Sequence, residues 1–273
     1  MADFRELLGS ALSWKLLAFL FICFNVKCLP FVWHIRFLRT FFRRLTDPAP
    51  SKNLSPQCLF LPAITSTRSP LLECDYNLHK SNSTYFTDLD MSRGNICLLL
   101  FGKAFNPFPG PAHLNIVLGS ACCVWRREIK PYQRYELWTR ILSWDEKWIY
   151  LVTHFVEAGR FKPARYILKP GSRRTGGSKE DRDASKGVFA SSVARYVFKN
   201  GRQTVPPEQV LRQCGLLHAE TEDDSISNGP NLLETESQRQ KWLPVAQLHH
   251  GWDAIHALFK GEGSIALGRY AAV

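Results

Sequence analysis

The sequence has few features that could hold a metal ion or a disulfide framework. Its eight cysteines form no C-x-x-C pair, and paired spacings are typical of zinc sites and redox motifs. Several lie within apolar runs, where a free cysteine behaves as a small hydrophobic residue. We therefore expect no disulfides, no metal site and no cofactor, and we infer a reducing compartment.

Signatures of nucleic-acid-binding modules and internal repeats are also missing from the sequence. The net charge of +11 favours anionic partners such as nucleic acid, anionic lipid, an acidic carrier protein or a phosphorylated cofactor. Positive charge gathers in residues 27–44 and 160–186, whereas residues 218–237 are acidic and contain no Lys or Arg. Because no module signature accompanies the basic residues, nucleic acid is not an expected partner.

An apolar run lies near the N-terminus but has a lysine at each border. Leu16–Val26 reads LLAFLFICFNV between Lys15 and Lys27. Extension of this run to membrane-spanning length would include both lysines and Pro30, so the transmembrane signal is marginal. A cleaved signal peptide is the alternative, although residues 27–30 lack the small side chains of a cleavage site.

The next segment has the pattern of a basic amphipathic helix. Pro30 can open a helix, and apolar residues then recur on one helical face at Phe31, Ile35, Leu38, Phe42 and Leu45. Arginines occupy much of the remaining surface, at Arg36, Arg39, Arg43 and Arg44. Such helices are typical of membrane interfaces; the alternative is a helix packed on the core with a solvated basic face. We predict that residues 1–46 hold the chain on a membrane, either spanning it or lying on it.

Basic residues predict the orientation of the chain on that membrane. Two of them precede the apolar run and five follow it, so the positive-inside rule places the main domain on the cytoplasmic side if the run spans. Glycosylation sequons occur at Asn53 and Asn82. A glycan at Asn82 would obstruct the motif described below, which also disfavours a luminal domain.

The rest of the chain divides into a linker, one domain and a tail. Residues 47–62 are rich in Pro, Ser and Asn and predict a linker. Within residues 63–215, Asn82–Phe101 predicts a long helix in which Gly94 marks a close packing contact. β-Branched and aromatic residues predict strands over Leu114–Ile129, Arg134–Trp144, Lys147–Ala158 and Gly187–Phe198, with a hairpin turn at 143–147 and a short helix from Pro206.

Two segments interrupt or follow this domain. Residues 160–186 include a Gly/Ser/Lys/Arg-rich stretch that predicts a flexible insertion in a hairpin. Residues 216–273 predict an acidic disordered stretch and a C-terminal helix over Gln238–Lys260. A long helix followed by consecutive antiparallel strands is an α+β layout, in which the sheet buries its apolar face against the helix.

The candidate chemistry lies in the block DYNLHKSNSTY, residues 75–85, just before the long helix. Asp, Asn and Ser are common turn and capping residues, so a plain turn is the competing interpretation. However, Asp75, Asn77 and His79 alternate and would share one side of an extended segment. Histidine can exchange a proton near neutral pH, and a helix N-terminus favours a developing oxyanion.

The pattern D-x-N-x-H-x-x-N-x-x-Y in this block resembles the acyl-thioesterase motif of the hotdog-fold superfamily that includes 4-hydroxybenzoyl-CoA thioesterases. The resemblance extends over about Leu29–Gln213 and continues through the segments 135–150 and 193–198. Within the superfamily it is similar to the branch of thioesterase superfamily member 6 and to fungal thioesterases of secondary-metabolite clusters. It implies a hotdog fold, in which a curved antiparallel sheet wraps a long central helix, and it implies a homodimer.

The resemblance also implies roles for individual residues. Asp75 is similar to the carboxylate that acts as nucleophile or general base, with Asn77 orienting water or thioester and His79 as an acid/base or polarising partner. Asn82 and Tyr85 match positions that cap and pack the helix. Basic residues that follow a strand could contact cofactor phosphates or an acidic carrier, or could form a solvated edge: Arg126, Arg127 and Lys130.

Three functions follow as alternatives. The leading one is hydrolysis of acyl-CoA or acyl-carrier-protein thioesters, in which a carboxylate attacks directly or draws a proton from water. The second is a hotdog dehydratase or isomerase, which moves a proton beside the carbonyl. The third is a membrane-tethered hotdog protein that binds lipid without catalysis. Release of free thiol separates the first from the others.

Overall fold

The computed structural model describes residues 2–46, 54–105, 114–163, 166–168, 184–217 and 230–248. An antiparallel sheet of six strands forms the centre of the fold, in the order β1-β3-β4-β5-β2 with β6 beside β5. The strands are β1 (Ala63–Arg68), β2 (Asn115–Trp125), β3 (Arg134–Trp144), β4 (Ile149–Glu157), β5 (Val188–Asn200) and β6 (Gln203–Val205). Strands β1 and β2 lie at the two ends of this order.

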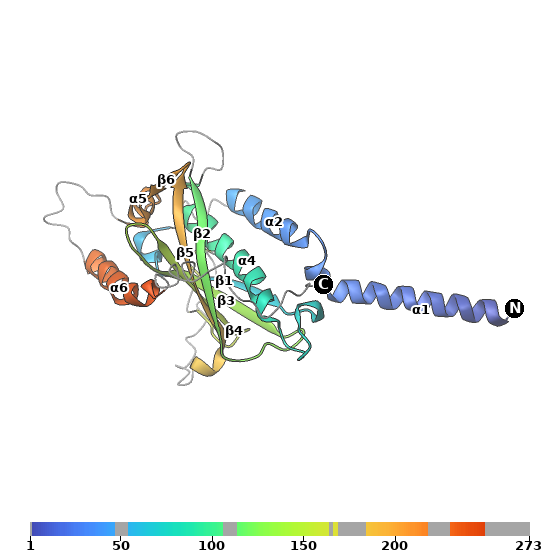
Figure 1. The fold of residues 1–273 in the computed structure, drawn as a ribbon. Helices are drawn as coiled ribbons and strands as arrows, with labels where there is room; N and C mark the ends of the chain where they lie inside the picture. Colours follow the sequence, from blue (N-terminus) through green and yellow to red (C-terminus); the bar gives the residue numbers. More distant parts are fainter. Residues whose placement is uncertain are drawn as a thin grey trace, which may run out of the picture.

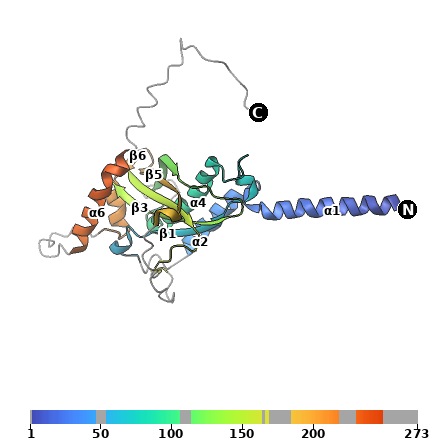
Figure 2. The ribbon, with the colours of Figure 1, turned by 90° about the horizontal axis from the view of Figure 1, so that it is seen from below.

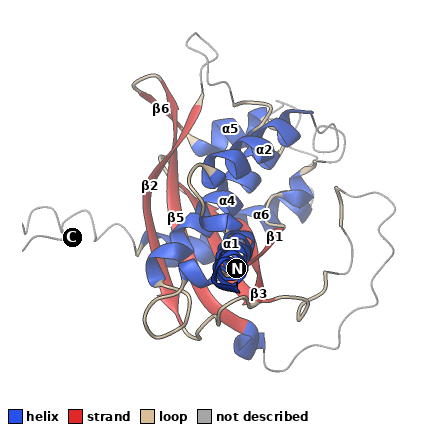
Figure 3. Cartoon of the chain, turned by 90° about the vertical axis from the view of Figure 1, so that its right-hand side faces the viewer, coloured by secondary structure: helices blue, strands red, loops and turns tan. Residues whose placement is uncertain are grey.

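A long helix, α4 (Asn82–Phe101), lies along the concave face of the sheet. Figure 3 shows the sheet curving around this helix. Two further helices contact the sheet: α5 (Pro207–Gln213) follows β6 and packs against β5, and α6 (Pro230–Gln247) packs on β3. The predicted α+β fold, with a long helix wrapped by a curved antiparallel sheet, is confirmed.

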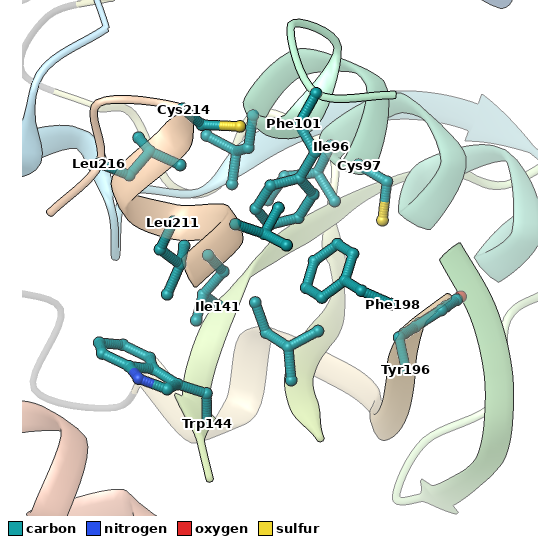
Figure 4. Close-up of a cluster of buried hydrophobic side chains, with 14 of the residues drawn as sticks. Ile96, Cys97, Phe101, Ile141, Trp144, Tyr196, Phe198, Leu211, Cys214 and Leu216 are labelled. Carbon is teal, nitrogen blue, oxygen red and sulfur yellow. The ribbon is translucent and has the colours of Figure 1, made fainter. Parts of the chain in front are cut away.

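The alternation of side chains along the strands separates the two faces of the sheet. On β3, Tyr135, Leu137, Thr139 and Ile141 are buried toward α4, whereas Trp138 and Arg140 between them are only half-buried. The main core contains Phe101 of α4, Phe198 of β5 and Leu211 of α5, which Figure 4 shows converging with Ile141. A smaller cluster on the other face of the sheet joins Val152 of β4 to Trp242 and Ala246 of α6.

The sequence located most of these elements. The predicted helix Asn82–Phe101 has the same limits as α4, and the strand Arg134–Trp144 has the limits of β3. The strand predicted over Leu114–Ile129 ends earlier, at Trp125, because the chain then leaves the sheet to contact the loop before α4. Strand β1, which pairs with β3 from Ala63 to Arg68, was not predicted.

The segment predicted as a linker is partly built into the core. Residues 54–62 include a 3-10 turn, η2 (Pro56–Cys58), and Leu59 directly after it is fully buried. Phe60 stacks on Trp144 with ring centroids 6.0 Å apart. This part of the linker prediction is therefore wrong. The segment is rich in polar residues, but its two large apolar side chains, Leu59 and Phe60, pack against the sheet. Residues 47–53 lie outside the described residues.

The C-terminal helix begins earlier than predicted. Helix α6 starts at Pro230 and takes in Glu234 and Glu236, which the sequence assigned to a disordered stretch. Arg239 pairs with Glu236 at 2.6 Å across less than one helical turn, and this pairing favours the helix. Three segments lie outside the described part of the chain: most of the predicted flexible insertion, the acidic residues within 218–229, and residues 249–273.

Two N-terminal helices precede the sheet. Helix α1 (Ala2–Phe24) projects away from the body of the molecule (Figures 1 and 2), and the 3-10 turn η1 (Val26–Cys28) connects it to α2 (Val32–Thr46). Helix α2 packs on α4, where the Phe37 ring lies against Gly94. None of the helices among the described residues has the length and apolar character needed to cross a membrane. The spanning alternative for residues 1–46 is therefore not supported.

Candidate active site

The loop Asp75–His79 folds into a closed turn immediately before α4. The Asp75 amide donates to the His79 carbonyl at 2.9 Å, and the Leu78 amide donates to the Asp75 carbonyl at 3.0 Å. Leu78 adopts a φ of 57°, in the left-handed region that such turns require. At the base of the turn, Cys74 and Lys80 form an antiparallel bridge.

This turn changes the expected arrangement of the three candidate residues. Asp75 and His79 stand at its two ends, and the Asp75 Oδ2 lies 3.5 Å from the His79 Nδ1. Asn77 lies at the exposed tip, where its backbone amide donates to the Asp75 Oδ1 at 2.9 Å. The side chains therefore do not share one side of an extended segment, because the chain reverses within five residues. The structure brings the Asp75 and His79 side chains together and places Asn77 at the exposed tip of the turn.

The Asp75–His79 pair lies where a substrate can reach it. The two side chains retain 26% and 24% of their exposed surface, and α4 begins three residues beyond His79. The first amides of a helix have no partner within the helix, and its dipole favours negative charge at this end. A carboxylate, an imidazole and a helix N-terminus thus occur within one short stretch of chain.

The residues expected to support the loop occupy different environments. Ser81, not Asn82, takes the N-cap position of α4, and Asn82 is the exposed first residue of the helix. Tyr85 is buried, and its ring contacts Trp125 edge-on and Phe155 at a centroid distance of 4.9 Å. Trp125 therefore packs against the first turn of α4. Trp144 belongs to the main core, and Trp148 packs on the other face of the sheet against Gly119 of β2.

The basic residues after β2 are exposed and lie beside the loop. Arg126, Arg127 and Lys130 lie in the same short segment as Ile129, whose carbonyl accepts the Lys80 amide at 2.8 Å. Arg127 donates to the carbonyl of Lys186 and lies over the ring of Phe189 at 4.9 Å. A positive edge therefore adjoins the turn that carries Asp75 and His79.

A buried group of charges behind the loop is the feature that sequence reasoning missed. Glu73 and Lys80, on either side of the turn, are joined at 2.6 Å, and Lys80 also lies 3.0 Å from Asp88 of α4. Lys27, from η1, lies 2.8 Å from both Glu73 and Asp88. Tyr135 of β3 donates its hydroxyl to Asp88. We call these residues the ion cluster: Lys27, Glu73, Lys80, Asp88 and Tyr135.

Burial and charge act in opposite directions on Asp88. Burial alone would raise the pKa of this carboxyl, but the ammonium groups of Lys27 and Lys80 and the hydrogen bonds from Lys27 and Tyr135 outweigh it, so its pKa is lowered. Burial and the neighbouring Asp88 charge raise the pKa of Tyr135 well above its usual value. Asp88 is therefore a carboxylate and Tyr135 a neutral hydrogen-bond donor over a wide pH range. The sequence contained one signal that Asp88 is buried. Asp88 falls on the same helix face as Tyr85, Leu89 and Ser92, all of which are buried in the structure.

The sheet order, the long helix against its concave face and a candidate acidic residue just before that helix together define a hotdog-type protein. Residues 70–212, more than half of the chain, match the Thioesterase-like superfamily. The chain is 36% identical to the probable thioesterase atnL of Emericella nidulans, over 92% of this chain and 89% of that protein. The chain belongs to the Thioesterase-like superfamily.

Other relatives agree with this membership. Thioesterase poxG of Penicillium oxalicum is 36% identical over 90% of this chain and 87% of its own length. Protein THEM6 of Danio rerio is 31% identical over a shorter match, which covers 32% of this chain and 41% of that protein. The resemblance to fungal thioesterases and to the member 6 branch is confirmed.

Proposed function

We propose that the protein hydrolyses acyl thioesters, with Asp75 as the nucleophile or general base and His79 beside it. The observation that carries this proposal is the carboxylate–imidazole pair, 3.5 Å apart, at the N-terminus of the central helix. Its membership of the Thioesterase-like superfamily supports it, and so do the names of relatives that match about nine-tenths of the chain.

The chemistry follows from the groups at the loop. The Asp75 carboxylate either attacks the thioester carbonyl to form a mixed anhydride, which water then hydrolyses to the free acid, or draws a proton from a water that attacks the carbonyl. The amides of the first turn of α4 stabilise the oxyanion, and a carbon–oxygen bond replaces the carbon–sulfur bond. The leaving thiolate needs little acid assistance, and the proton removed from water can pass to it through His79. In this proposal, Asn77 orients water or substrate from the tip of the turn.

Coenzyme A and acyl carrier protein are the two substrate carriers considered. The exposed positive edge of Arg126, Arg127 and Lys130 suits either the phosphates of coenzyme A or an acidic carrier surface. Fungal relatives named as thioesterases match most of the chain, and the resemblance to secondary-metabolite thioesterases motivates a biosynthetic role. We propose that the product, a free carboxylic acid, belongs to secondary metabolism.

Thiol release from purified protein tests the proposed hydrolysis. We expect a thiol-reactive dye to detect coenzyme A or carrier thiol on incubation with a panel of acyl-CoA and acyl-carrier-protein substrates. Product acid, measured by mass spectrometry, should appear in equal amount. A dehydratase or isomerase would change the acyl group and release no thiol, and a lipid-binding protein would do neither. Absence of thiol release across both carriers would overturn the proposal.

We also propose that the N-terminal helices lie on an anionic membrane surface, with the loop facing the cytoplasm. Ile35, Leu38 and Phe42 form one row along α2, Phe31 lies directly before this helix, and each of the four keeps 51% to 75% of its surface exposed. Arg39 and Arg43 are exposed on the same helix. Helix α1 adds exposed Trp14, Phe19 and Phe24. A surface with apolar and basic side chains of this kind matches an interfacial helix.

Flotation with vesicles containing phosphatidylserine tests the membrane proposal. The wild-type protein should float with the vesicles, and the triple variant Phe31→Asp, Ile35→Asp, Leu38→Asp should remain at the bottom. Leu233→Asp, at an exposed apolar position on α6, serves as the control. Equal flotation of the triple variant and the control would contradict the proposal.

We further propose a homodimer that pairs through β2. This strand is at the end of the sheet and bonds only β5 among the described strands. Val117, Leu118, Val124 and Trp125 on it are between 39% and 56% exposed. An unpaired apolar edge strand is a site for strand pairing with another chain. The Asp75–His79 pair of one protomer would then face the helix of its partner.

A further inference from the structure

The N-terminal segment reaches directly into the support of the candidate loop. Asn25, which is 1% exposed, accepts the Leu72 amide on its side-chain oxygen at 3.0 Å. Two residues later, Lys27 donates to the Arg68 carbonyl at 3.1 Å and to Glu73 at 2.9 Å. The turn between α1 and α2 therefore holds the chain that leads into Asp75 at three points.

The residues that Lys27 contacts fix the base of the loop. Glu73 precedes Asp75 by two residues, and its carbonyl accepts the Ser81 amide at 2.8 Å and the Thr84 hydroxyl at 3.2 Å. Its side chain meets Lys80, which directly follows His79. Glu73 and Lys80 thus clamp the two ends of the turn together and attach both to the first turn of α4.

Charge balance makes Lys27 a necessary part of this clamp. Two ammonium groups, Lys27 and Lys80, face two carboxylates, Glu73 and Asp88, and none of the four side chains is more than 11% exposed. Without Lys27, a single ammonium group would face both carboxylates. Arg36 of α2 is 3.9 Å from Asp88 and 30% exposed, so it sits at the margin of the cluster. A buried charge without its partner is strongly unfavourable, and the group moves or water enters to relieve it.

We propose that the ion cluster positions the Asp75–His79 loop, and that Lys27 is a positioning residue through which the N-terminal segment controls the geometry of the site. The proposal rests on the catalytic role proposed for Asp75 and His79. It assigns the N-terminal segment a role in turnover that is separate from any membrane attachment. Lys27 acts through Glu73 and Lys80 and does not touch the reacting atoms.

Hydrogen exchange at individual amides tests the positioning directly. Lys27→Met keeps the length of the side chain and removes its charge. We expect exchange at the Asp75 and Ser81 amides, both hydrogen-bonded within the loop, to become at least tenfold faster. Exchange in the pairing of β3 with β4 should be unchanged, which distinguishes a loosened loop from a destabilised fold. Lys15→Met, at an exposed lysine of α1, is the matched control, and Lys27→Arg should restore most of the protection.

Turnover measured on the same proteins reports separately on the catalytic role. Lys27→Met should lower kcat about tenfold or more with little change in KM, because Lys27 is buried in the ion cluster behind the loop. If Lys27→Met does not fold, Tyr135→Phe removes one hydrogen bond to Asp88 without changing charge and should give the same effects in smaller degree. Loop exchange equal to that of the Lys15→Met control would overturn the positioning proposal whatever the turnover. Faster loop exchange with unchanged kcat would support the positioning and instead contradict the catalytic role of the loop.

Discussion

At the residue scale, the candidate site consists of a few charged side chains placed by one tight turn. The alternation of Asp75, Asn77 and His79 predicted a shared side, but the pairing of Asp75 with His79 arises from chain reversal at Leu78. The same pattern of residues is compatible with an extended strand or a turn, and the bridge between Cys74 and Lys80 together with the backbone hydrogen bonds inside the turn selects the turn. The sequence therefore identified the candidate residues, but it did not predict how their side chains are arranged.

Lys27 shows most clearly why the ion cluster could not be predicted from sequence. In the sequence, it borders an apolar run and precedes four arginines, which is typical of a membrane-flanking charge. In the structure, its partner Glu73 is 46 residues away and its partner Asp88 is 61 residues away. Local pattern carries no information about such distant pairings.

The acid sensitivity of the fold should depend on Asp88. Its pKa is lowered in the folded protein, so its stabilisation is complete above the unfolded value of about 4 and is lost as the pH falls through the lower, folded value. Lys27 and Lys80, Glu73, Tyr135 and Arg36 are the charged or titratable groups that face it. We expect Asp88→Asn to lower the free energy of unfolding at pH 7 by about 3–5 kcal/mol, because it leaves buried ammonium groups under-compensated.

Denaturant unfolding between pH 7 and pH 3 measures this effect. The wild-type protein should lose stability more steeply below about pH 4 than the Asp88→Asn variant does. Glu146→Gln, at an exposed carboxylate in the turn between β3 and β4, is the control and should follow the wild-type curve closely. If the free energies of unfolding of wild type and Asp88→Asn change with pH in parallel, Asp88 is not the cause of the acid sensitivity.

At the element scale, the packing of α2 on α4 depends on a single glycine. A Cβ built at Gly94 would lie 2.9 Å from the Phe37 Cε2, closer than carbon atoms normally approach. Gly94→Leu should therefore force the two helices apart and destabilise the protein by about 1–3 kcal/mol. Phe37→Ala opens space at the contact, so the cost of Gly94→Leu should shrink in that background. Calorimetric or denaturant unfolding of the four proteins measures the coupling; additive effects would mean that the two residues do not meet.

The elements themselves were predictable to different degrees. Helix α4 and strand β3 were found because long apolar and alternating patterns report on local geometry. Strand β1, AITSTR, is a short edge strand with few apolar residues, and its identity depends on pairing with β3 across the chain. Leu59 and Phe60 were taken for part of a linker because their neighbours are Pro, Ser and Gln, although their side chains pack into the core.

At the scale of the whole molecule, the proposed dimer is the next level of organisation. Val124→Lys places like charges opposite one another across a β2–β2 pairing and should shift the protein from dimer to monomer in analytical ultracentrifugation. If the pocket lies between protomers, the turnover of Val124→Lys should fall as the dimer dissociates. Ser66→Lys introduces the same charge on β1, the opposite edge of the sheet, at an exposed position, and should leave the dimer intact. A wild-type monomer with full activity would contradict the dimer proposal.

The most direct test of the account is thioester hydrolysis by Asp75→Asn, normalised to folded protein. Asparagine keeps a side-chain oxygen that can accept the Asn77 amide, so the turn is preserved while the carboxylate is lost. Tyr76→Ala, in the same turn and 92% exposed, is the control and should retain turnover. We predict that kcat for Asp75→Asn falls by about a hundredfold or more, which corresponds to roughly 3 kcal/mol of barrier. Turnover within a few-fold of wild type would show that Asp75 only shapes the turn, and would contradict its role in catalysis.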